Sequence, residues 1–319
     1  MEKLKFIDLC AGIGGFRSAL NYHADCLLTC EIDKFCKKTY IENYKDQQWF
    51  DDIKKIEPKK LENFDILCGG FPCQAFSLAG KQLGFSDIRG TIFFDIAQII
   101  DIKKPKAFFL ENVKNLRTHD KGNTFKTIKK TLDDLNYWHK DFLINAQHFV
   151  PQKRQRIYIL GLRKDLFSKD DFISMVKDIE SKYLLQQSLP LPKFKDILEK
   201  KVDDKYTLST KLWSFLQSHA NKHSAKGNGF GFGLMEDQDI SSRTLTARYY
   251  KDGSEILVKQ KNKNPRKLTP RECARLMGYS EDFKIVVSDT QAYKQFGNSV
   301  VVPVIEMLVE SLIRCIKKN

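Results

Sequence analysis

The sequence predicts an α/β fold with a mixed, mostly parallel sheet, joined to a smaller, irregular, β-rich domain. Short apolar runs alternate with amphipathic helical segments as far as about residue 185, and the alternation then stops. A glycine-rich turn at residues 11–16 directly follows the first apolar run. In doubly wound folds this is the turn at which nucleotide-like ligands approach the backbone.

The composition of the chain indicates which class of partner to expect. The chain has 319 residues, with 54 Lys and Arg against 40 Asp and Glu, a net charge of +14. Such a surplus favours a polyanion partner, although a merely lysine-rich composition is the alternative. No apolar run reaches the length of a membrane span and the N-terminus lacks a signal-peptide core, so we expect a cytoplasmic protein without membrane contact.

Metal binding is not expected. The eight cysteines include no Cys-x-x-Cys pair, and all except Cys73 read as packing residues in a reducing compartment. His219 and His223 are four residues apart but lack an acidic partner of the metalloprotease kind.

The first two predicted strands, residues 5–10 and 26–30, suggest a nucleotide-type site between them. Arg17 stands where a dinucleotide signature has its last glycine, so the motif is incomplete and a turn without a ligand is the alternative. Glu31, at the end of the second strand, suits ribose hydroxyls, whereas Asp33 suits the cap of a helix over 34–40. Asp52 suits either an adenine amino group or a turn.

The third predicted strand, residues 64–68, ends in two glycines and is followed by Pro72 and Cys73. Pro72 fixes its own φ and stiffens the approach to Cys73. A thiol just beyond the carboxyl end of a parallel strand is well placed to react. The alternative is an inert, buried cysteine.

A carboxylate and two arginines are predicted at the same edge. A helix over 91–102 precedes a strand over 106–110, which ends at Glu111. After a helix over 123–135, strands are expected at 138–146 and 157–162. Arg154 and Arg156, just before the second of these, are two residues apart and would share a strand face. A solvated basic edge is the alternative to a functional pair.

Beyond residue 185 the composition changes to Lys, Gly and Ser with scattered aromatics. Residues 243–250 indicate a strand that enters an Asp-Gly turn. Arginines, aromatics and glycine loops suit a nucleic-acid surface, and an irregular β subdomain that only packs is the alternative. A capped helix then starts at Thr269-Pro270 and ends by Gly278, and a core-facing helix covers 300–316.

In this order, six segments resemble the motifs of bacterial DNA (cytosine-5) methyltransferases of restriction–modification systems. They are residues 6–16, 70–74 and 111–113, then Gln152 with Arg154 and Arg156, then residues 266–272 and 297–300. The resemblance covers residues 6–162 and 266–304. It implies a Rossmann-like, S-adenosylmethionine-dependent methyltransferase domain at 1–185 and 284–319. A target-recognition domain would cover 186–268 and a hinge helix region 269–283.

The resemblance also implies roles for individual residues. Cys73 would add to C6 of a flipped cytosine, and Glu111 would neutralise the charge that develops at N3. The two arginines would lower the pKa of the thiol and hold the base or a phosphate. Asn298 would orient the nucleophile loop. The catalytic set is Cys73, Glu111, Arg154, Arg156 and Asn298. The cofactor-binding set is Phe6, Gly12, Gly14, Gly15, Glu31, Ile32, Asp52, Ile53, Pro72 and Asn298. The DNA-binding set is Gln74, Ser77, Lys81, Arg89, Arg243, Arg248, Tyr249 and Lys251.

Two positions depart from the family pattern. Cys10 replaces a common aromatic before the Ala-Gly of the cofactor loop, and Ile32 replaces a bulky aromatic after Glu31. Both changes thin the apolar walls around the adenine, so altered cofactor affinity is expected.

The implied cofactor is S-adenosylmethionine, with S-adenosylhomocysteine as product and no metal. The implied partner is double-stranded DNA, and a separate cognate restriction endonuclease encoded nearby would form no stable complex. A monomer in the cytoplasm, associated with the nucleoid, is expected.

Three alternatives remain. The first is a tRNA cytosine-5 methyltransferase of the same architecture, which the long segment before Arg266 disfavours. The second is a non-catalytic nucleic-acid-binding protein, whose motifs would lack a Cys, Glu or Arg. The third is a dinucleotide oxidoreductase, disfavoured by the incomplete glycine pattern.

Overall fold

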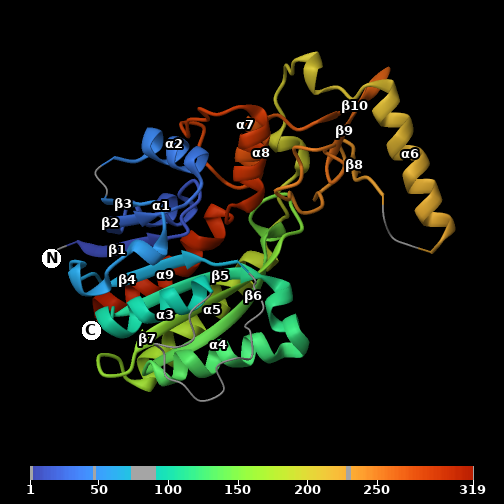
Figure 1. The fold of residues 1–319 in the computed structure, drawn as a ribbon. Helices are drawn as coiled ribbons and strands as arrows, with labels where there is room; N and C mark the ends of the chain where they lie inside the picture. The colour runs from blue at the N-terminus through green and yellow to red at the C-terminus, as the bar shows by residue number, and fades with distance from the viewer. Residues whose placement is uncertain (1–2, 46–47, 73–90, 228–230, 319) are drawn as a thin grey trace.

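The computed structural model describes residues 3–45, 48–72, 91–227 and 231–318. Its main feature is a seven-stranded sheet in the order β3-β2-β1-β4-β5-β7-β6 (Figure 1). The strands are β1 Leu4–Leu9, β2 Ala24–Cys30, β3 Gln48–Phe50, β4 Ile66–Gly70, β5 Ala107–Val113, β6 Tyr137–Asn145 and β7 Gln155–Arg163. The first five in sheet order are parallel, and β7 runs antiparallel to both of its neighbours. The predicted mixed, mostly parallel α/β fold is confirmed.

Helices cover both faces of this sheet. One layer consists of α1 Gly15–Leu20, α5 Lys169–Ser188 and α9 Val302–Lys318, and the other of α3 Ile92–Lys103 and α4 Asn123–Asp134. Successive residues of a strand point to opposite faces, so Phe109 packs with the first layer while Phe108 and Leu110 pack with the second. Burial on both faces explains why the central strands are continuous apolar runs.

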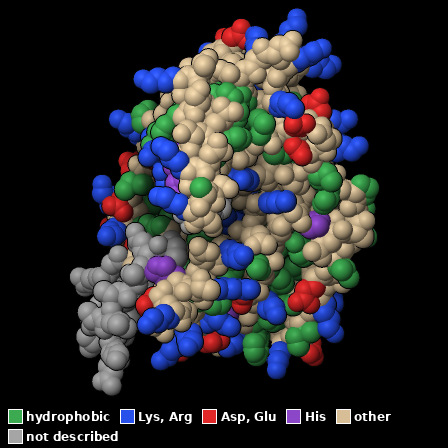
Figure 2. Space-filling view, turned by 90° about the vertical axis from the view of Figure 1, so that its right-hand side faces the viewer, with side chains coloured by type: hydrophobic (Ala, Val, Ile, Leu, Met, Phe, Trp, Pro, Cys, Tyr) green, Lys and Arg blue, Asp and Glu red, His purple; other side chains and the backbone are tan. Residues whose placement is uncertain are grey.

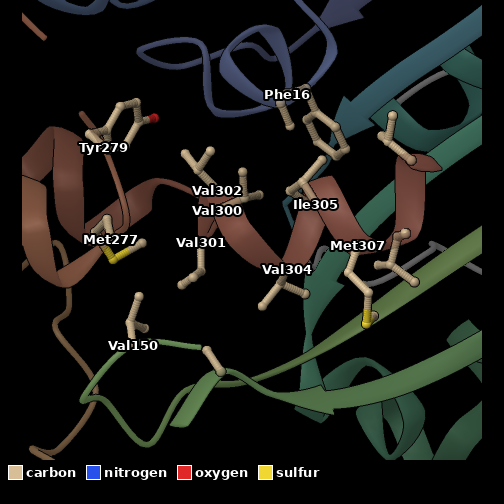
Figure 3. Packing of buried hydrophobic residues seen from close by; sticks show 14 of the residues in the cluster. Phe16, Val150, Met277, Tyr279, Val300, Val301, Val302, Val304, Ile305 and Met307 are labelled. Carbon is tan, nitrogen blue, oxygen red and sulfur yellow. The ribbon is translucent and has the colours of Figure 1, made fainter. Parts of the chain in front are cut away.

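The start of α9 is a packing centre of the first layer. Figure 3 shows Phe16 pointing toward Ile305, with Val300 and Val302 between Tyr279 and the rest of the helix. All these side chains are buried. Because this junction directly follows α8, residues at the end of α8 are held close to the glycine-rich turn.

The remaining elements lie between and around these layers. They are α2 Lys34–Asn43, α6 Thr210–Ala225, α7 Pro270–Leu276 and α8 Asp289–Asn298, with a second sheet in the order β10-β9-β8 made of β8 Leu234–Met235, β9 Leu257–Gln260 and β10 Lys263–Lys267. Short 3₁₀ turns occur at Ile53–Lys55, Pro58–Lys60, Lys114–Arg117, His119–Gly122, Ala146–His148, Phe194–Ile197 and Asp204–Tyr206. The sheet β8–β10 and α6 form a lobe at one end of the molecule (Figure 1). The domain boundaries given above stay a prediction.

The structure differs from the sequence analysis at two places in the chain. Helix α6 was not predicted, although Ser209 caps it by accepting the N–H of Leu212. Residues 243–250 form no strand, because their backbone groups bond to other segments. The N–H of Leu245 donates to the Gln152 side chain and its carbonyl accepts from Arg154, so no sheet partner is needed.

A buried ion pair joins the small lobe to α7. The Arg266 guanidinium donates to both oxygens of Glu272 at 2.7 and 2.8 Å. Glu272 also accepts the N–H of Thr269, which caps the helix in return, so the predicted cap is confirmed. The pair thereby ties the last strand of the lobe to the start of α7.

In the described part of the chain, no helix is both long and apolar enough to cross a membrane.

Candidate active site

The carboxyl ends of β1, β4 and β5 meet at one edge of the sheet and open into a cavity of about 390 Å³. Its walls come from the glycine-rich turn, the ends of β4 and β5, the arginine segment and the junction of α8 with α9. They include Gly12, Pro72, Glu111, Arg156, Asn298 and Val300. The structure therefore brings together residues that the sequence predicted from five separate segments.

Glu111 and Arg156 form an ion pair on the cavity wall. The Arg156 Nε lies 3.2 Å from Glu111 Oε1, and both side chains retain a small exposed fraction. The pairing of Val113 with Arg156 across β5 and β7 explains this proximity. Burial raises the pKa of Glu111, while Arg156 and Arg154 act in the opposite direction. Glu111 is thus a carboxyl that holds a proton more readily than an exposed one.

Arg154 does not share a strand face with Arg156, because β7 begins only at Gln155. Its guanidinium is buried and donates to the carbonyls of Leu245 at 2.8 Å, Gly297 at 3.1 Å and Ser299 at 2.7 Å. Both arginines still line the first cavity, but Arg154 is held by backbone carbonyls whereas Arg156 pairs with Glu111. Arg154 fixes the backbone on both sides of Asn298, as a positioning residue would.

Gln152 has a similar structural function that the sequence alone left open. Its side-chain oxygen accepts the N–H of Leu245 at 2.7 Å, and its amide donates to the carbonyl of Leu276 at 3.2 Å. Gln152 is completely buried. Its side chain thereby links residue Leu245 to the end of α7 at Leu276.

The glycine-rich turn is a tightly packed part of the cavity wall. Gly12 and Gly14 have φ values of 57° and 85°, which side chains disfavour. A Cβ on Gly14 would lie 2.4 Å from the Tyr44 ring, and one on Gly15 would lie 2.4 Å from Val300 Cγ2. Larger residues would therefore displace the turn.

Glu31 holds this turn from the end of β2. Its Oε2 accepts the N–H of Gly12 at 2.9 Å, and its Oε1 accepts the N–H of Asp33 at 2.8 Å. Asp33 caps α2 as predicted, by accepting from Phe35 and Cys36. Each Glu31 oxygen keeps a lone pair for a further donor, as binding of ribose hydroxyls requires.

A second cavity, of about 420 Å³, adjoins the first at Cys10, Glu31 and Pro72. Its lining comprises Cys10, Cys30, Glu31, Ile32, Asp51, Asp52, Ile53, Lys54, Pro72 and Ile92. Apolar side chains with carboxylates at one rim fit a nucleoside. Asp52 also caps a 3₁₀ turn by accepting the N–H of Lys54, so the predicted turn is confirmed, and the contact with adenine stays a prediction.

Two predicted site residues are core residues instead. Phe6 is completely buried, with the Arg17 guanidinium 5.8 Å from its ring centroid, and neither cavity includes it. Tyr249 is also completely buried, and its hydroxyl donates to Ile256 and accepts from Leu268. These two assignments are corrected. Cys10 lines both cavities, and Ile32 lines the second.

The other predicted DNA-binding residues divide into two groups. Arg243, Arg248 and Lys251 are exposed on the small lobe, where Arg243 also donates to the carbonyl of Gly231. Gln74, Ser77, Lys81 and Arg89 lie outside the described residues, as does the predicted nucleophile Cys73. Among the described residues, no three Cys, His, Asp or Glu side chains form a metal-binding group.

Comparison with known proteins defines the class. Residues 4–314 match the family described as C-5 cytosine-specific DNA methylase. The chain belongs to this family, and it is a DNA (cytosine-5-)-methyltransferase, an enzyme that uses S-adenosylmethionine.

Individual relatives agree. The chain is 52% identical to the type II methyltransferase M1.ScrFI of Lactococcus lactis subsp. cremoris, over 99% of this chain and 80% of the relative. It is 50% identical to the type II methyltransferase M.SsoII of Shigella sonnei, over 98% and 80% of the two chains. The solved structure of S. pombe Dnmt2 methyltransferase superimposes with a TM-score of 0.76 over 98% of this chain and 99% of that one; at 21% identity it shows the fold alone.

Proposed function

We propose that this enzyme methylates a cytosine within a specific double-stranded DNA sequence and thereby protects DNA from a cognate restriction endonuclease. The relatives at 50% and 52% identity are named type II methyltransferases, which supports this assignment. The observation that carries the catalytic part is the Glu111–Arg156 pair beside the end of β4, the strand that leads to Pro72 and Cys73.

The two adjoining cavities would hold the cofactor. Glu31 would bind the ribose hydroxyls, Asp52 and Ile53 the adenine, and the Gly12 turn the methionine part. S-adenosylmethionine supplies a methyl group on a positively charged sulfur. Pro72 lines both cavities and so would border both the cofactor and the base.

The base would be activated by this chain's own residues. The Cys73 thiolate would add to C6 of cytosine, which places nucleophilic density on C5. Glu111, with its raised pKa, would share a proton with N3 and neutralise the charge that builds on the ring. Arg156 would hold Glu111 in place and contact the base oxygen. After methylation C5 would lose its proton and Cys73 would be expelled.

The target cytosine must leave the duplex, because C6 cannot be reached inside the stack. Gln74, Ser77, Lys81 and Arg89 would contact DNA near the target, and the exposed Arg243, Arg248 and Lys251 would contact it from the small lobe. Asn298, held through its neighbours by Arg154, would orient the nucleophile loop.

The experiment that tests this function compares methyl transfer to duplex DNA with transfer to tRNA. Transfer to DNA at a defined sequence, located by bisulfite or long-read mapping in expressing cells, is expected. Transfer to tRNA alone would instead identify the tRNA methyltransferase. We further propose that the protein is a monomer and forms no stable complex with the endonuclease. Its activity should persist in the presence of EDTA.

A further inference from the structure

Helix α6 packs on the small lobe through only one of its faces. Leu216 is buried, and Leu212 and Trp213 pack with it against Leu208 and Leu257. Most of the remaining surface of the helix is exposed, including 60% of Phe215. In Figure 1 the helix stands at the outer side of the lobe.

One exposed flank of α6 carries all of its positive charge. At about 100° per residue, five side chains fall within a sector of about 80°. They are Lys211, Phe215, His219 and Lys222 on the helix, with Lys226 at its C-cap, which we call the basic flank. The rings of Phe215 and His219 are neighbours, with centroids 5.9 Å apart. The other exposed positions of the helix are uncharged, mainly Ser, Gln and Asn.

The basic flank lacks compensating acidic residues. No Asp or Glu occurs between Asp204 and Glu236. Three lysines of neighbouring segments are paired: Lys205 with Asp289, Lys259 with Glu236, and Lys263 with Asp204. Within the described residues, by contrast, no ion pair involves the lysines of the basic flank.

We propose that the basic flank binds the phosphate backbone of DNA beyond the target cytosine; this inference rests on the proposed function. Lys211 and Lys226 are about 22 Å apart along the helix axis, the axial length of about six to seven base pairs. A protein partner fits less well, because the centres of protein–protein interfaces are depleted in lysine. Figure 2, which views the molecule from the side where α6 stands, shows Lys and Arg side chains over both the upper and lower parts of this face.

The test is the salt dependence of DNA binding by the full chain. The variant Lys211→Gln/Lys222→Gln/Lys226→Gln removes three charges from the basic flank. The control Lys38→Gln/Lys59→Gln/Lys317→Gln removes three exposed charges from other surfaces. Fluorescence anisotropy with a labelled duplex of about 40 base pairs would give the slope of log Kd against log salt, which falls by about 0.9 for each phosphate that the protein no longer neutralises.

The proposal predicts a slope smaller by about 2 to 3 in the flank variant and a nearly unchanged slope in the control. Equal slopes in the two variants would overturn it and leave the basic flank to a protein partner. Methyl transfer to DNA by the unaltered enzyme, measured alongside, keeps the two proposals apart. If that transfer is absent the proposed function fails, whereas equal slopes with normal transfer contradict only the assignment of α6.

Discussion

The Arg156 guanidinium lies 3.2 Å from the Glu111 carboxylate, on the wall of the cavity at the end of the parallel strands. This pair places a carboxyl of raised pKa next to a fixed positive charge. The arrangement suits a group that must share a proton with a base yet keep one orientation.

Glu111→Gln should lower the rate of methyl transfer by about 10²- to 10⁴-fold, because the amide cannot transfer a proton to N3. Affinity for the cofactor should change little, since Glu31 and the glycine-rich turn are untouched. In the unaltered enzyme the raised pKa keeps Glu111 protonated to higher pH, and the rate should fall as pH rises through it. Single-turnover rates across pH measure both effects, and a near-normal rate for the variant would exclude Glu111 from catalysis.

Substitutions of Arg154 and Arg156 should have different effects, the first mainly on stability and the second mainly on catalysis. Arg154→Ala leaves three buried carbonyls without their donor, so the free energy of unfolding should fall by about 3 kcal/mol or more. Arg156→Ala is the matched control, because its side chain borders the cavity and its loss should change unfolding by less than about 1 kcal/mol while abolishing most activity. Urea unfolding and methyl-transfer rates distinguish them. Equal destabilisation by both would contradict the positioning role of Arg154.

Glu31→Ala should weaken cofactor binding by about 10- to 100-fold, because it removes a charged acceptor that also holds the Gly12 N–H. Asp33→Ala removes the cap of α2 at the edge of the same cavity but leaves both Glu31 oxygens in place, so it should cost about 1 kcal/mol of stability and lower cofactor affinity far less than Glu31→Ala. Calorimetric titration of both variants with S-adenosylhomocysteine gives the comparison. Normal affinity in the Glu31 variant would show that the ribose binds elsewhere.

Asp8 should make stability depend on pH. It is completely buried, and burial raises its pKa to about 8, against the attraction of Arg17. The unfolded chain loses this proton near pH 4, so between about pH 4 and 8 only the folded state holds it. Its contribution is therefore greatest at low pH and is lost as pH rises toward 8.

Asp8→Asn removes this titration. From pH 5 to pH 8 the unaltered protein should lose at least about 1 kcal/mol of stability relative to the variant. Denaturant unfolding at the two pH values tests this, and parallel changes in both proteins would show that Asp8 is ionised in the fold.

Much of the catalytic lobe could be predicted from the sequence. Runs such as residues 106–110 are apolar because helices cover both faces of the strand, and the glycines of the first turn are required by contacts with Tyr44 and Val300. The apolar runs and the glycines therefore predicted the correct strands and turn. The pairing of β4 with β5 then places Glu111 beside Gly70.

Other features depend on contacts between distant segments. Arg154 reads like its neighbour Arg156, and only the fold shows that residues 245, 297 and 299 supply its acceptors. Tyr249 reads as a surface aromatic, but its hydroxyl finds two backbone partners in the core. Helix α6 carries few apolar residues and buries only Leu216. Its sequence therefore shows no clear helical spacing of apolar residues.

The central claim is that Cys73 attacks a cytosine activated at the Glu111–Arg156 site. A duplex with 5-fluorocytosine at the mapped target, incubated with the enzyme and S-adenosylmethionine, tests it most directly, because fluorine cannot leave C5 as a proton does. If Cys73 is the nucleophile, the complex survives denaturation, carries the DNA on a peptide containing Cys73, and is absent for Cys73→Ser. No stable complex with the unaltered enzyme, or one attached to another residue, would contradict it.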